Sequence, residues 1–269
     1  MDKPHHEDAR PLESRRKDEA RTRHPYAIRY PADYLVRMIQ GQRVLGVIPA
    51  RGGSKRVSRK NLRPLAGRPL LVWTIDAARA SEVVDRFVVS SEDVEILDLA
   101  RSLGAETVER PAALASDEAA SVDVVIDALD QVADEVEWVL LLQPTSPFRT
   151  GEDIDRCVRA AYSAGASAAI AVTEPERSPY LSFTLDDAGY LKALFPVDFS
   201  HARSQDLPRC YAVNGAVYAA TTEWLRTKRT FIHDRALAYV MPRDRSADID
   251  TEEDFASAEL SWARRESIT

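Results

Sequence analysis

The stretch VLGVIPARGGSKRVSRKN, residues 44–61, decides the expected fold. Its first seven residues form an apolar, partly β-branched run of the length that is typical of a buried strand. Gly52 and Gly53 come directly afterwards, and no acidic residue lies between Asp33 and Asp76. A strand that leads into a small-residue turn, with backbone N–H groups and cations around it, is typical of a polyphosphate site. The cations of this stretch are Arg51, Lys55, Arg56, Arg59 and Lys60.

The spacing of the glycines excludes two common phosphate-binding motifs. The stretch matches neither the Walker A pattern G-x-x-x-x-G-K-[ST] nor the dinucleotide pattern G-x-G-x-x-G. The alternative interpretation is a surface turn with a solvated run of charge. We favour phosphate binding because the glycines follow an expected strand directly, in a chain that alternates strands and helices.

Beyond this stretch, apolar runs alternate with segments of helical period. Alternation of this kind predicts βαβ units and an α/β, Rossmann-like, mostly parallel sheet flanked by helices, with right-handed crossovers and the ligand at the carboxyl edge of the strands. The expected strands cover residues 44–50, 87–90, 105–109, 138–142, 167–172, 211–220 and 236–241. The expected helices cover residues 70–80, 91–104 with Ser91 as its cap, 121–132, 151–161 and 251–264.

Two segments depart from the alternating pattern. Residues 180–194 predict a β-hairpin whose turn is Asp186-Asp187-Ala188-Gly189. Residues 1–41 are rich in charge and poor in large apolar side chains, so we expect a partly disordered N-terminal extension with a short amphipathic helix over residues 30–40. Residues 42–265 are then the folded domain.

Composition excludes several classes of protein. The 269 residues are 45% hydrophobic and 29% charged, which is ordinary for a globular domain. The formal net charge of −7 argues against a general nucleic-acid binder. No apolar run approaches the roughly 18 residues of a membrane span, and residues 1–11 lack the apolar core of a secretory signal. Cys157 and Cys210 form no disulfide framework or metal pattern, so we expect a reducing cytoplasm.

Two polar segments with prolines lie beside expected elements. RPAALASD, residues 110–117, is a loop that begins with a proline and precedes a helix, and Arg110 could simply form a surface ion pair. QPTSPFRT, residues 143–150, directly follows the most apolar strand and predicts a rigid polar rim over the sheet edge. A capping turn before the helix at residue 151 is compatible with the same residues.

The segment before the last helix carries an acidic pair. Asp248 and Asp250 are two residues apart on an extended segment, so their carboxylates lie on one side of it. Acidic residues are common before a helix, and Thr251 with Asp254 predicts a capping box there. If the pair faces the cationic loop, it would hold Mg²⁺, which binds one or two carboxylates together with phosphate oxygens.

Several of these motifs together resemble the CMP-sialic acid synthetase family, the cytidylyltransferases that activate nonulosonic acids. The matching segments are IPARGGSK with the later KN, RPAALASD, LLQPTSPFRT and NGAVY, within residues 44–259. The resemblance implies a nucleotidyltransferase-type α/β fold over residues 42–265. It also implies that an insertion at about residues 176–200, which contains the hairpin, contributes to a homodimer.

The resemblance also implies roles for individual residues. The nucleotide would be bound by Arg51, Ser54, Lys60, Asn61, Arg110, Ala119 and Ser121. The sugar would be bound by Gln143, Arg203, Asn214, Tyr218 and Asp248, with the Arg203 guanidinium suited to a carboxylate. Catalysis is expected from Lys60, Asp248 and Arg51, and Mg²⁺ binding from Asp248 and Asp250. Asp248 is a candidate both for a metal ligand and for a base.

The implied reaction converts CTP and an N-acylneuraminate into the CMP-sugar and pyrophosphate. Sialic-acid enzymes tend to have R-x-N-G where this chain has Ala212-Val213-Asn214-Gly215, and RSQDLP, residues 203–208, resembles the pseudaminic acid branch. Pseudaminic, legionaminic and Kdo acids therefore stay open as acceptors. A catalytically inactive nucleotide-binding regulatory homologue is the alternative from another class.

Overall fold

A computed structural model describes residues 41–116, 118–132, 135–195, 203 and 206–266. The expected disorder of the N-terminal extension and the expected helix over residues 30–40 lie outside the described residues. Among the described residues, no helix is both long enough and apolar enough to cross a membrane.

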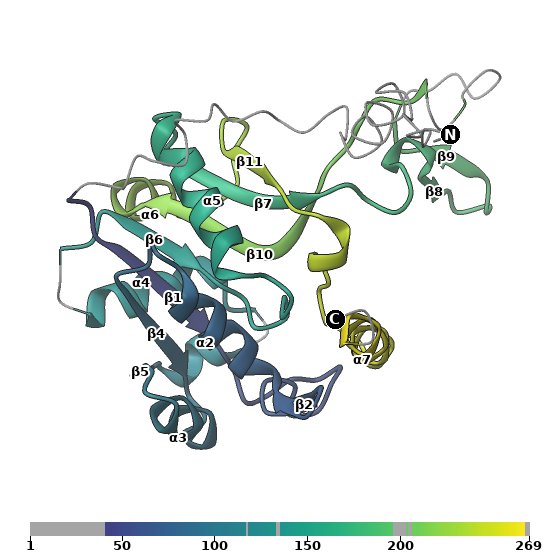
Figure 1. The fold of residues 1–269 in the computed structure, drawn as a ribbon. Coiled ribbons are helices and arrows are strands. Elements are labelled where there is room, and N and C mark those ends of the chain that lie inside the picture. Colours follow the sequence, from purple (N-terminus) through teal and green to yellow (C-terminus); the bar gives the residue numbers. More distant parts are fainter. Residues whose placement is uncertain (1–40, 117, 133–134, 196–202, 204–205, 267–269) are drawn as a thin grey trace, which may run out of the picture. The chain divides into compact units, whose positions relative to one another are not determined.

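The described residues form a seven-stranded sheet with the strand order β11-β7-β10-β6-β1-β4-β5 (Figure 1). Its strands are β1 (Val44–Pro49), β4 (Arg86–Ser91), β5 (Glu106–Glu109), β6 (Trp138–Leu141), β7 (Ala168–Thr173), β10 (Ala212–Thr221) and β11 (Leu237–Val240). Every neighbouring pair is parallel except the two that involve β10, which is antiparallel to β6 and β7. The predicted α/β, mostly parallel sheet is therefore confirmed.

The strand order creates a switch point between β1 and β6. From β1 the chain moves outward to β4 and β5, and it then returns to the other side of β1 to form β6. Loops that leave the carboxyl ends of strands on either side of such a point diverge and leave a crevice for a ligand. The Gly52-Gly53 loop follows β1 and the polar segment from Gln143 follows β6, so both lie at this crevice.

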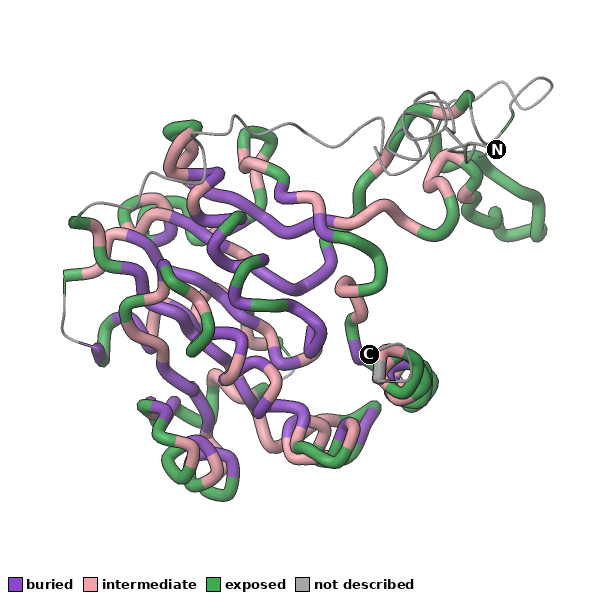
Figure 2. Tube along the Cα trace, in the orientation of Figure 1, coloured by how far each residue is buried: buried purple, intermediate pink, exposed green. Residues whose placement is uncertain are grey.

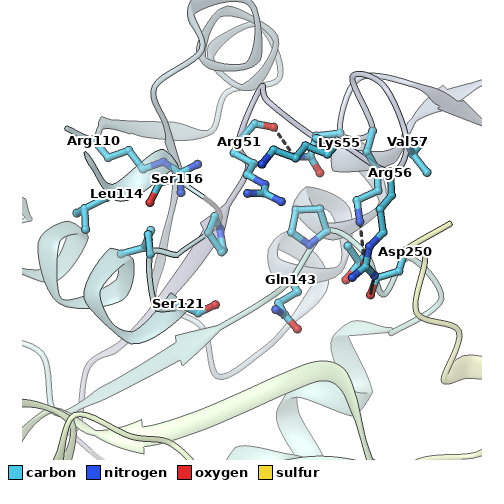
Figure 3. Close-up of a pocket in the computed structure, with 18 residues that line it drawn as sticks. Arg51, Lys55, Arg56, Val57, Arg110, Leu114, Ser116, Ser121, Gln143 and Asp250 are labelled. Atoms are coloured by element: carbon cyan, nitrogen blue, oxygen red, sulfur yellow. Dashed lines mark hydrogen bonds and ion pairs between the residues drawn. The ribbon is translucent and has the colours of Figure 1, made fainter. Parts of the chain in front are cut away.

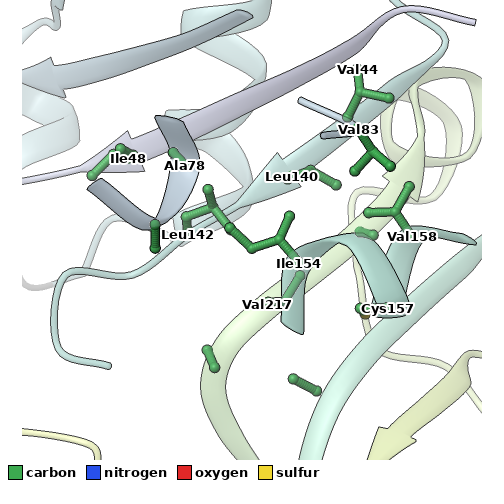
Figure 4. Close-up of a cluster of buried hydrophobic side chains, with 14 of the residues drawn as sticks. Val44, Ile48, Ala78, Val83, Leu140, Leu142, Ile154, Cys157, Val158 and Val217 are labelled. Carbon is green, nitrogen blue, oxygen red and sulfur yellow. The ribbon is translucent and has the colours of Figure 1, made fainter. Parts of the chain in front are cut away.

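Helices cover both faces of the sheet. They are α2 (Leu70–Ala80), α3 (Val94–Ser102), α4 (Ser121–Gln131), α5 (Gly151–Ser163), α6 (Thr222–Lys228) and α7 (Glu252–Glu266). Side chains from α2, α3 and α5 pack with Val44 and Ile48 of β1, whereas side chains from α4 and α6 pack with Leu45 and Val47. This alternation along β1 follows from the period of two in a strand. Figure 4 shows the first cluster, in which Ile154 and Val158 of α5 lie near β6.

The third cluster joins α7 to the segment after the glycine loop. Val57, Leu65 and Leu70 pack with Phe148, Ile249 and Phe255, and the ring of Trp73 meets that of Trp262 edge-on at 4.3 Å between centroids. A two-residue ribbon of β2 (Pro64–Leu65) and β3 (Arg68–Pro69), not expected from the sequence, lies within this region. The last helix therefore holds the segment that follows Gly52 and Gly53, from Val57 to Leu65, against the rest of the domain.

Two boundaries bear on the predictions. The sequence prediction that Ser91 caps α3 is wrong, because Ser91 is still the last residue of β4 and pairs with Glu109. Asp93 is the cap instead, and its carboxylate accepts hydrogen bonds from the N–H groups of Glu95 and Ile96. The predicted capping box of the last helix is confirmed, since Thr251 and Asp254 bond each other's backbone N–H groups at 2.8 and 3.2 Å.

The predicted hairpin over residues 180–194 is also confirmed. Strands β8 (Phe183–Leu185) and β9 (Leu191–Ala193) pair antiparallel, and Gly189 has a φ of +85° in the turn. Both strands are exposed along their whole length (Figure 2), although Leu185 and Leu191 are apolar. The hairpin thus presents apolar side chains that the described residues of its own domain do not cover.

Candidate active site

A cavity of about 560 Å³ opens at the crevice beyond β1 and β6 (Figure 3). The predicted site residues that line it are Arg51, Ser54, Lys60, Asn61, Arg110, Ala119, Ser121, Gln143 and Asp250. All the residues predicted to bind the nucleotide therefore meet at one cavity. Its volume lies within the range of sites that enclose a small-molecule ligand.

The charge of this cavity suits a polyanion. Its lining includes the cations Arg51, Lys55, Arg56, Lys60 and Arg110. Among the described lining residues, Asp250 is the single carboxylate. Charged groups of one sign in a cleft of low dielectric attract a ligand of the opposite sign. The arrangement therefore favours a phosphorylated ligand over a neutral one.

The glycine loop is fixed by the residues that follow β4. The N–H of Gly52 donates to Glu92 Oε1 at 2.8 Å. A Cβ at Gly52 would lie 2.1 Å from Asp93 Oδ2, so a side chain here would force Asp93, the cap of α3, to move. The side-chain amide of Asn61 donates to the carbonyl oxygen of Arg51 at 2.9 Å and ties the two ends of the loop together. Ser54 Oγ is buried and has no hydrogen-bond partner among the described residues, which suits contact with a ligand.

The segment that carries the acidic pair reaches the cationic loop at Lys60. Lys60 Nζ donates to the carbonyl oxygen of Ile249 at 2.8 Å and to Asp250 Oδ1 at 3.0 Å. Arg56 lies 3.7 Å from the other carboxylate oxygen of Asp250. Ile249 is buried between Asp248 and Asp250, which are both exposed, so the two carboxylates share one side of the segment.

Asp248 is held against the segment that follows β6. The backbone N–H of Ile249 donates to the carbonyl oxygen of Thr145 at 2.8 Å, and the Thr145 side chain bonds the Asp248 carboxyl. Although Asp248 as a whole is exposed, the surrounding protein partly desolvates its carboxyl and so raises its pKa; the Thr145 bond opposes this effect and the charge of Asp250 adds to it. Burial and the charge of Asp248 in turn raise the pKa of Tyr218, so the Asp248 carboxylate lies close enough to act on this second predicted sugar-binding residue.

Gly215 lies where three functional segments converge. A Cβ there would be 2.9 Å from Gln143 Oε1, 3.1 Å from Ser146 Oγ and 3.6 Å from Asp248 Cγ. Its φ of +74° belongs to the left-handed region that favours glycine. Because Gly215 has no side chain, the amide of Gln143 and the carboxyl of Asp248 can both lie close to its backbone.

Arg110 forms a buried ion pair, not a surface one. Its Nε and Nη2 donate to Glu92 Oε2 at 2.9 and 2.8 Å, and only 3% of its side chain is exposed. The same residue lines the cavity beside Ala119 and Ser121. The Arg110 guanidinium is therefore fixed at the part of the cavity wall where the family resemblance implies that the base of the nucleotide binds.

Four predicted residues do not line the cavity: Asp248, Arg203, Asn214 and Tyr218. Arg203 is exposed, and its neighbours at 204 and 205 lie outside the described residues. Asn214 is buried; its amide donates to Ser246 Oγ at 3.0 Å and its Oδ1 accepts from Ala216 N at 3.2 Å. In this structure Asn214 thus shapes the turn of β10 around Gly215. The sugar contacts of these residues stay predictions.

Two charged groups that support the site were not predicted from the sequence. Arg149 is buried and donates to the carbonyl oxygens of Gln143, at 3.1 Å, and Ala216, and to Thr74 Oγ1 at 2.5 Å. Burial lowers the pKa of Arg149 to about 9. It joins the segment after β6 to β10 and α2. An arginine next to a proline-rich turn gives no signal in the sequence that it is buried.

The second group is Asp153, near the start of α5. Its carboxylate accepts from Arg245 at 2.8 and 2.9 Å and from Tyr239 Oη at 3.1 Å. Burial alone would raise the pKa of Asp153, but the bonds and charge of Arg245 and the bonds from Thr150 outweigh it and lower this pKa. Because Arg245 directly precedes the segment that carries Asp248, the ion pair anchors that segment. The T-x-x-D pattern of Thr150 and Asp153 could have indicated the capping box, but not the ion pair.

Comparison with known proteins identifies relatives of the chain. Residues 45–257 match the model of the family described as "Cytidylyltransferase". The chain is 35% identical over 211 residues to the N-acylneuraminate cytidylyltransferase of Streptococcus agalactiae, covering 78% of this chain and 51% of that protein. It is 35% identical over 224 residues to the CMP-N,N'-diacetyllegionaminic acid synthase of Legionella pneumophila, covering 81% and 95%. The chain thus spans about half the length of the first relative and nearly all of the second.

Solved structures show the same fold at low sequence identity. A CMP:2-keto-3-deoxy-manno-octonic acid synthetase complexed with CTP matches with a TM-score of 0.63 and 15% identity, over 83% of this chain and 100% of that one. A 4-diphosphocytidyl-2C-methyl-D-erythritol synthase from Anaerococcus prevotii matches with a TM-score of 0.61 and 15% identity, over 84% and 99%.

Proposed function

The chain belongs to the cytidylyltransferase family, and from that premise we propose that it transfers the cytidylyl group of CTP to a nonulosonic acid and releases pyrophosphate. The observation that carries the proposal is the contact of Lys60 with Asp250 at 3.0 Å, at the edge of a cavity lined mainly by cations. It joins the cationic loop after β1 to the acidic pair before α7. These are the two parts that phosphoryl transfer requires, since its catalysis is mostly positioning and charge stabilisation.

In the proposed reaction, the C2 hydroxyl of the sugar attacks the α-phosphorus of CTP. The new bond joins that oxygen to phosphorus, the bond to the pyrophosphate oxygen breaks, and the hydroxyl proton leaves. Arg51 and Lys60 would neutralise the phosphoryl oxygens, while Ser54 and Asn61 would hold the triphosphate and ribose. If Asp248 acts as the base and not as a metal ligand, it accepts this proton, and its raised pKa makes the carboxylate a stronger base.

Asp248 and Asp250 would hold a Mg²⁺ ion. Their carboxylates are the hard oxygen ligands that Mg²⁺ prefers, both are exposed, and Asp250 lines the cavity. Mg²⁺ takes few protein ligands when phosphates supply others, so a pair of carboxylates is sufficient. When bound, the ion would screen the phosphates and make the attacking hydroxyl more acidic.

The acceptor is proposed at the level of its class. The relatives include an N-acylneuraminate, a legionaminic and a pseudaminic enzyme, the last from Campylobacter jejuni at 32% identity over 95% of that protein. N-acylneuraminate is our first choice, and pseudaminic, legionaminic and Kdo acids are the alternatives. A CTP-binding homologue without activity is the further alternative.

Pyrophosphate release from CTP with Mg²⁺, measured over these four acids, tests the proposal. Release with one of them identifies both the reaction and the acceptor, and UTP in place of CTP is the control for the nucleotide. If no pyrophosphate is released with any of the four acids although CTP binds measurably, the enzymatic proposal is contradicted and the inactive homologue is favoured.

We also propose that the chain forms a homodimer through the hairpin of β8 and β9. The support is the exposure of Leu185 and Leu191, at 68% and 69%, on neighbouring strands. Exposed apolar patches on a folded domain often mark interaction sites. We expect the mass in solution at micromolar concentration to be that of two chains, and a double substitution of Leu185 and Leu191 by Ser to lower it to one. A monomeric wild type would contradict the proposal. A cytoplasmic location stays a prediction.

A further inference from the structure

Glu92 holds two loops of the cavity with one carboxylate. The residue lies between β4 and α3. Its Oε1 accepts from the N–H of Gly52 at 2.8 Å, and its Oε2 accepts from Nε and Nη2 of Arg110 at 2.9 and 2.8 Å. The Glu92 side chain is 22% exposed. It does not line the cavity itself, but both of its partners belong to loops that do.

We propose that Glu92 is the positioning residue that makes the site selective for cytosine over uracil. It would do so by fixing the Arg110 guanidinium in one orientation and by fixing the glycine loop relative to it. The inference rests on the proposed binding of CTP in this cavity and deepens it, because it assigns base selectivity to a residue outside the cavity wall.

The chemistry of the two bases explains the selectivity. A guanidinium has five N–H donors in a rigid plane, and Glu92 engages the edge formed by Nε and Nη2. Glu92 takes two of these five donors, and Arg110 also lines the cavity. Cytosine offers acceptors at both O2 and N3, whereas N3 of uracil carries a hydrogen. N–H donors held in one orientation can therefore bind O2 and N3 of cytosine. With uracil, one of these donors would face the N3–H donor of the base.

Glu92 also makes this recognition depend on geometry more than on charge. Its carboxylate neutralises the cation at Arg110, so the guanidinium attracts any nucleotide less by charge alone. Without Glu92, Arg110 would be an unpaired cation next to a triphosphate site. It would then bind either nucleotide through its charge.

An amide at position 92 cannot replace the carboxylate. Both oxygens of Glu92 accept hydrogen bonds from donors, and a glutamine offers one acceptor and one donor of the same size. In Glu92→Gln, the NH₂ group must therefore face either the N–H of Gly52 or the N–H groups of Arg110. One of the two loops loses its anchor whichever way the amide turns.

The test measures the affinity of the whole chain for CTP and for UTP by calorimetry. No sugar acid is added, so that neither nucleotide is consumed. We expect Glu92→Gln to weaken CTP binding roughly tenfold and UTP binding less than about threefold, because a charged hydrogen bond that acts on the base is lost. The matched control is Glu95→Gln, in the first turn of α3, whose carboxylate pairs with Arg59 at 2.7 Å on the surface. It should leave both affinities unchanged.

The outcomes separate this inference from the proposed function. Wild-type protein that binds neither nucleotide would overturn both. If the wild type prefers CTP and Glu92→Gln keeps that preference, only the role of Glu92 is overturned. An equal loss for both nucleotides would also overturn it, since a purely structural role predicts that pattern. If Glu92→Gln does not fold, Glu92→Asp keeps the charge but is one methylene too short to reach both partners, and the same loss of preference is expected.

Discussion

Gly215→Ala tests whether Gln143 belongs to the acceptor site. The substitution adds one methyl group at a position whose φ is +74°. The new Cβ would lie 2.9 Å from Gln143 Oε1, which is closer than such atoms approach in folded proteins. Because this oxygen is the end of a flexible side chain, we expect the Gln143 amide to move away and the backbone to stay in place.

The cost in stability comes from the backbone conformation. A residue with a Cβ in the left-handed region is less stable there by about 1–2 kcal/mol. For a domain of this size, a loss of that order lowers the melting temperature by about 2–8 °C. Gly104→Ala is the matched control, since Gly104 has a φ of +73° and nothing within 4 Å of its Cβ position. The two variants should lose similar stability.

The cost in function comes from the displaced amide. If Gln143 bonds the sugar acid, moving it removes one hydrogen bond, which contributes about 0.5–1.5 kcal/mol. That free energy corresponds to a loss of roughly two- to tenfold in kcat/KM for the acid. The affinity for CTP should not change, because Gly215 lies near Gln143 and Asp248 and away from the glycine loop.

Steady-state kinetics of pyrophosphate release, with the acid varied at saturating CTP, measures this effect. Thermal unfolding of both variants gives the stability term. If Gly215→Ala and Gly104→Ala have the same kcat/KM for the acid, the reasoning that places Gln143 at the acceptor is refuted. A selective loss of CTP affinity in Gly215→Ala would refute it as well, because the amide would then serve the nucleotide.

Two further substitutions test the charged groups. Asp153→Asn should lower the free energy of unfolding by about 3 kcal/mol at pH 7, because it leaves Arg245 without its partner. The folded-state pKa of Asp153 is lowered, so its stabilisation is present above the unfolded pKa of about 3.9 and is lost as pH falls through the folded pKa. The difference in free energy of unfolding between wild type and Asp153→Asn, measured with denaturant, should therefore shrink below about pH 4. A difference that increases as the pH falls would contradict this role of Asp153. Asp250→Asn should reduce pyrophosphate release by roughly a hundredfold or more. Asp244→Asn, on an exposed carboxylate of the same segment, is its control, and equal activity of the two would contradict the role of Asp250.

The fold was predictable where the apolar period was strong. The helix of Leu70–Ala80 follows from its apolar period, and the strand of Val44–Pro49 follows from a short, partly β-branched apolar run that the sheet buries on both faces. The strand order and the antiparallel direction of β10 were not predictable, since they depend on contacts between distant segments. The cap of α3 was misplaced because Ser91, which has a suitable hydroxyl, is retained by the sheet through its pairing with Glu109.

The candidate site was predictable for a different reason. Glycines, cations and carboxylates at the ends of strands have few structural uses together, so the Gly52 loop and the Asp248–Asp250 pair stood out. Residues that act through another residue gave no such signal. In the sequence, Glu92 is an acidic residue near the start of an expected helix, and Arg149 is a cation in a segment with two prolines. Their roles depend on which partner the fold brings to them, and no single sequence pattern encodes that partner.

The position of Lys60 determines how a loss of activity at Asp250 should be interpreted. Lys60 Nζ contacts the Asp250 carboxylate at 3.0 Å and the carbonyl oxygen of Ile249 at 2.8 Å. The carbonyl belongs to the backbone, and the N–H of Ile249 is bonded to Thr145, so neither contact of Ile249 depends on the side chain at 250. In Asp250→Asn the lysine therefore keeps an anchor in the same place, and the amide preserves the size of the side chain. A loss of turnover would then report the missing negative charge and not a displaced lysine.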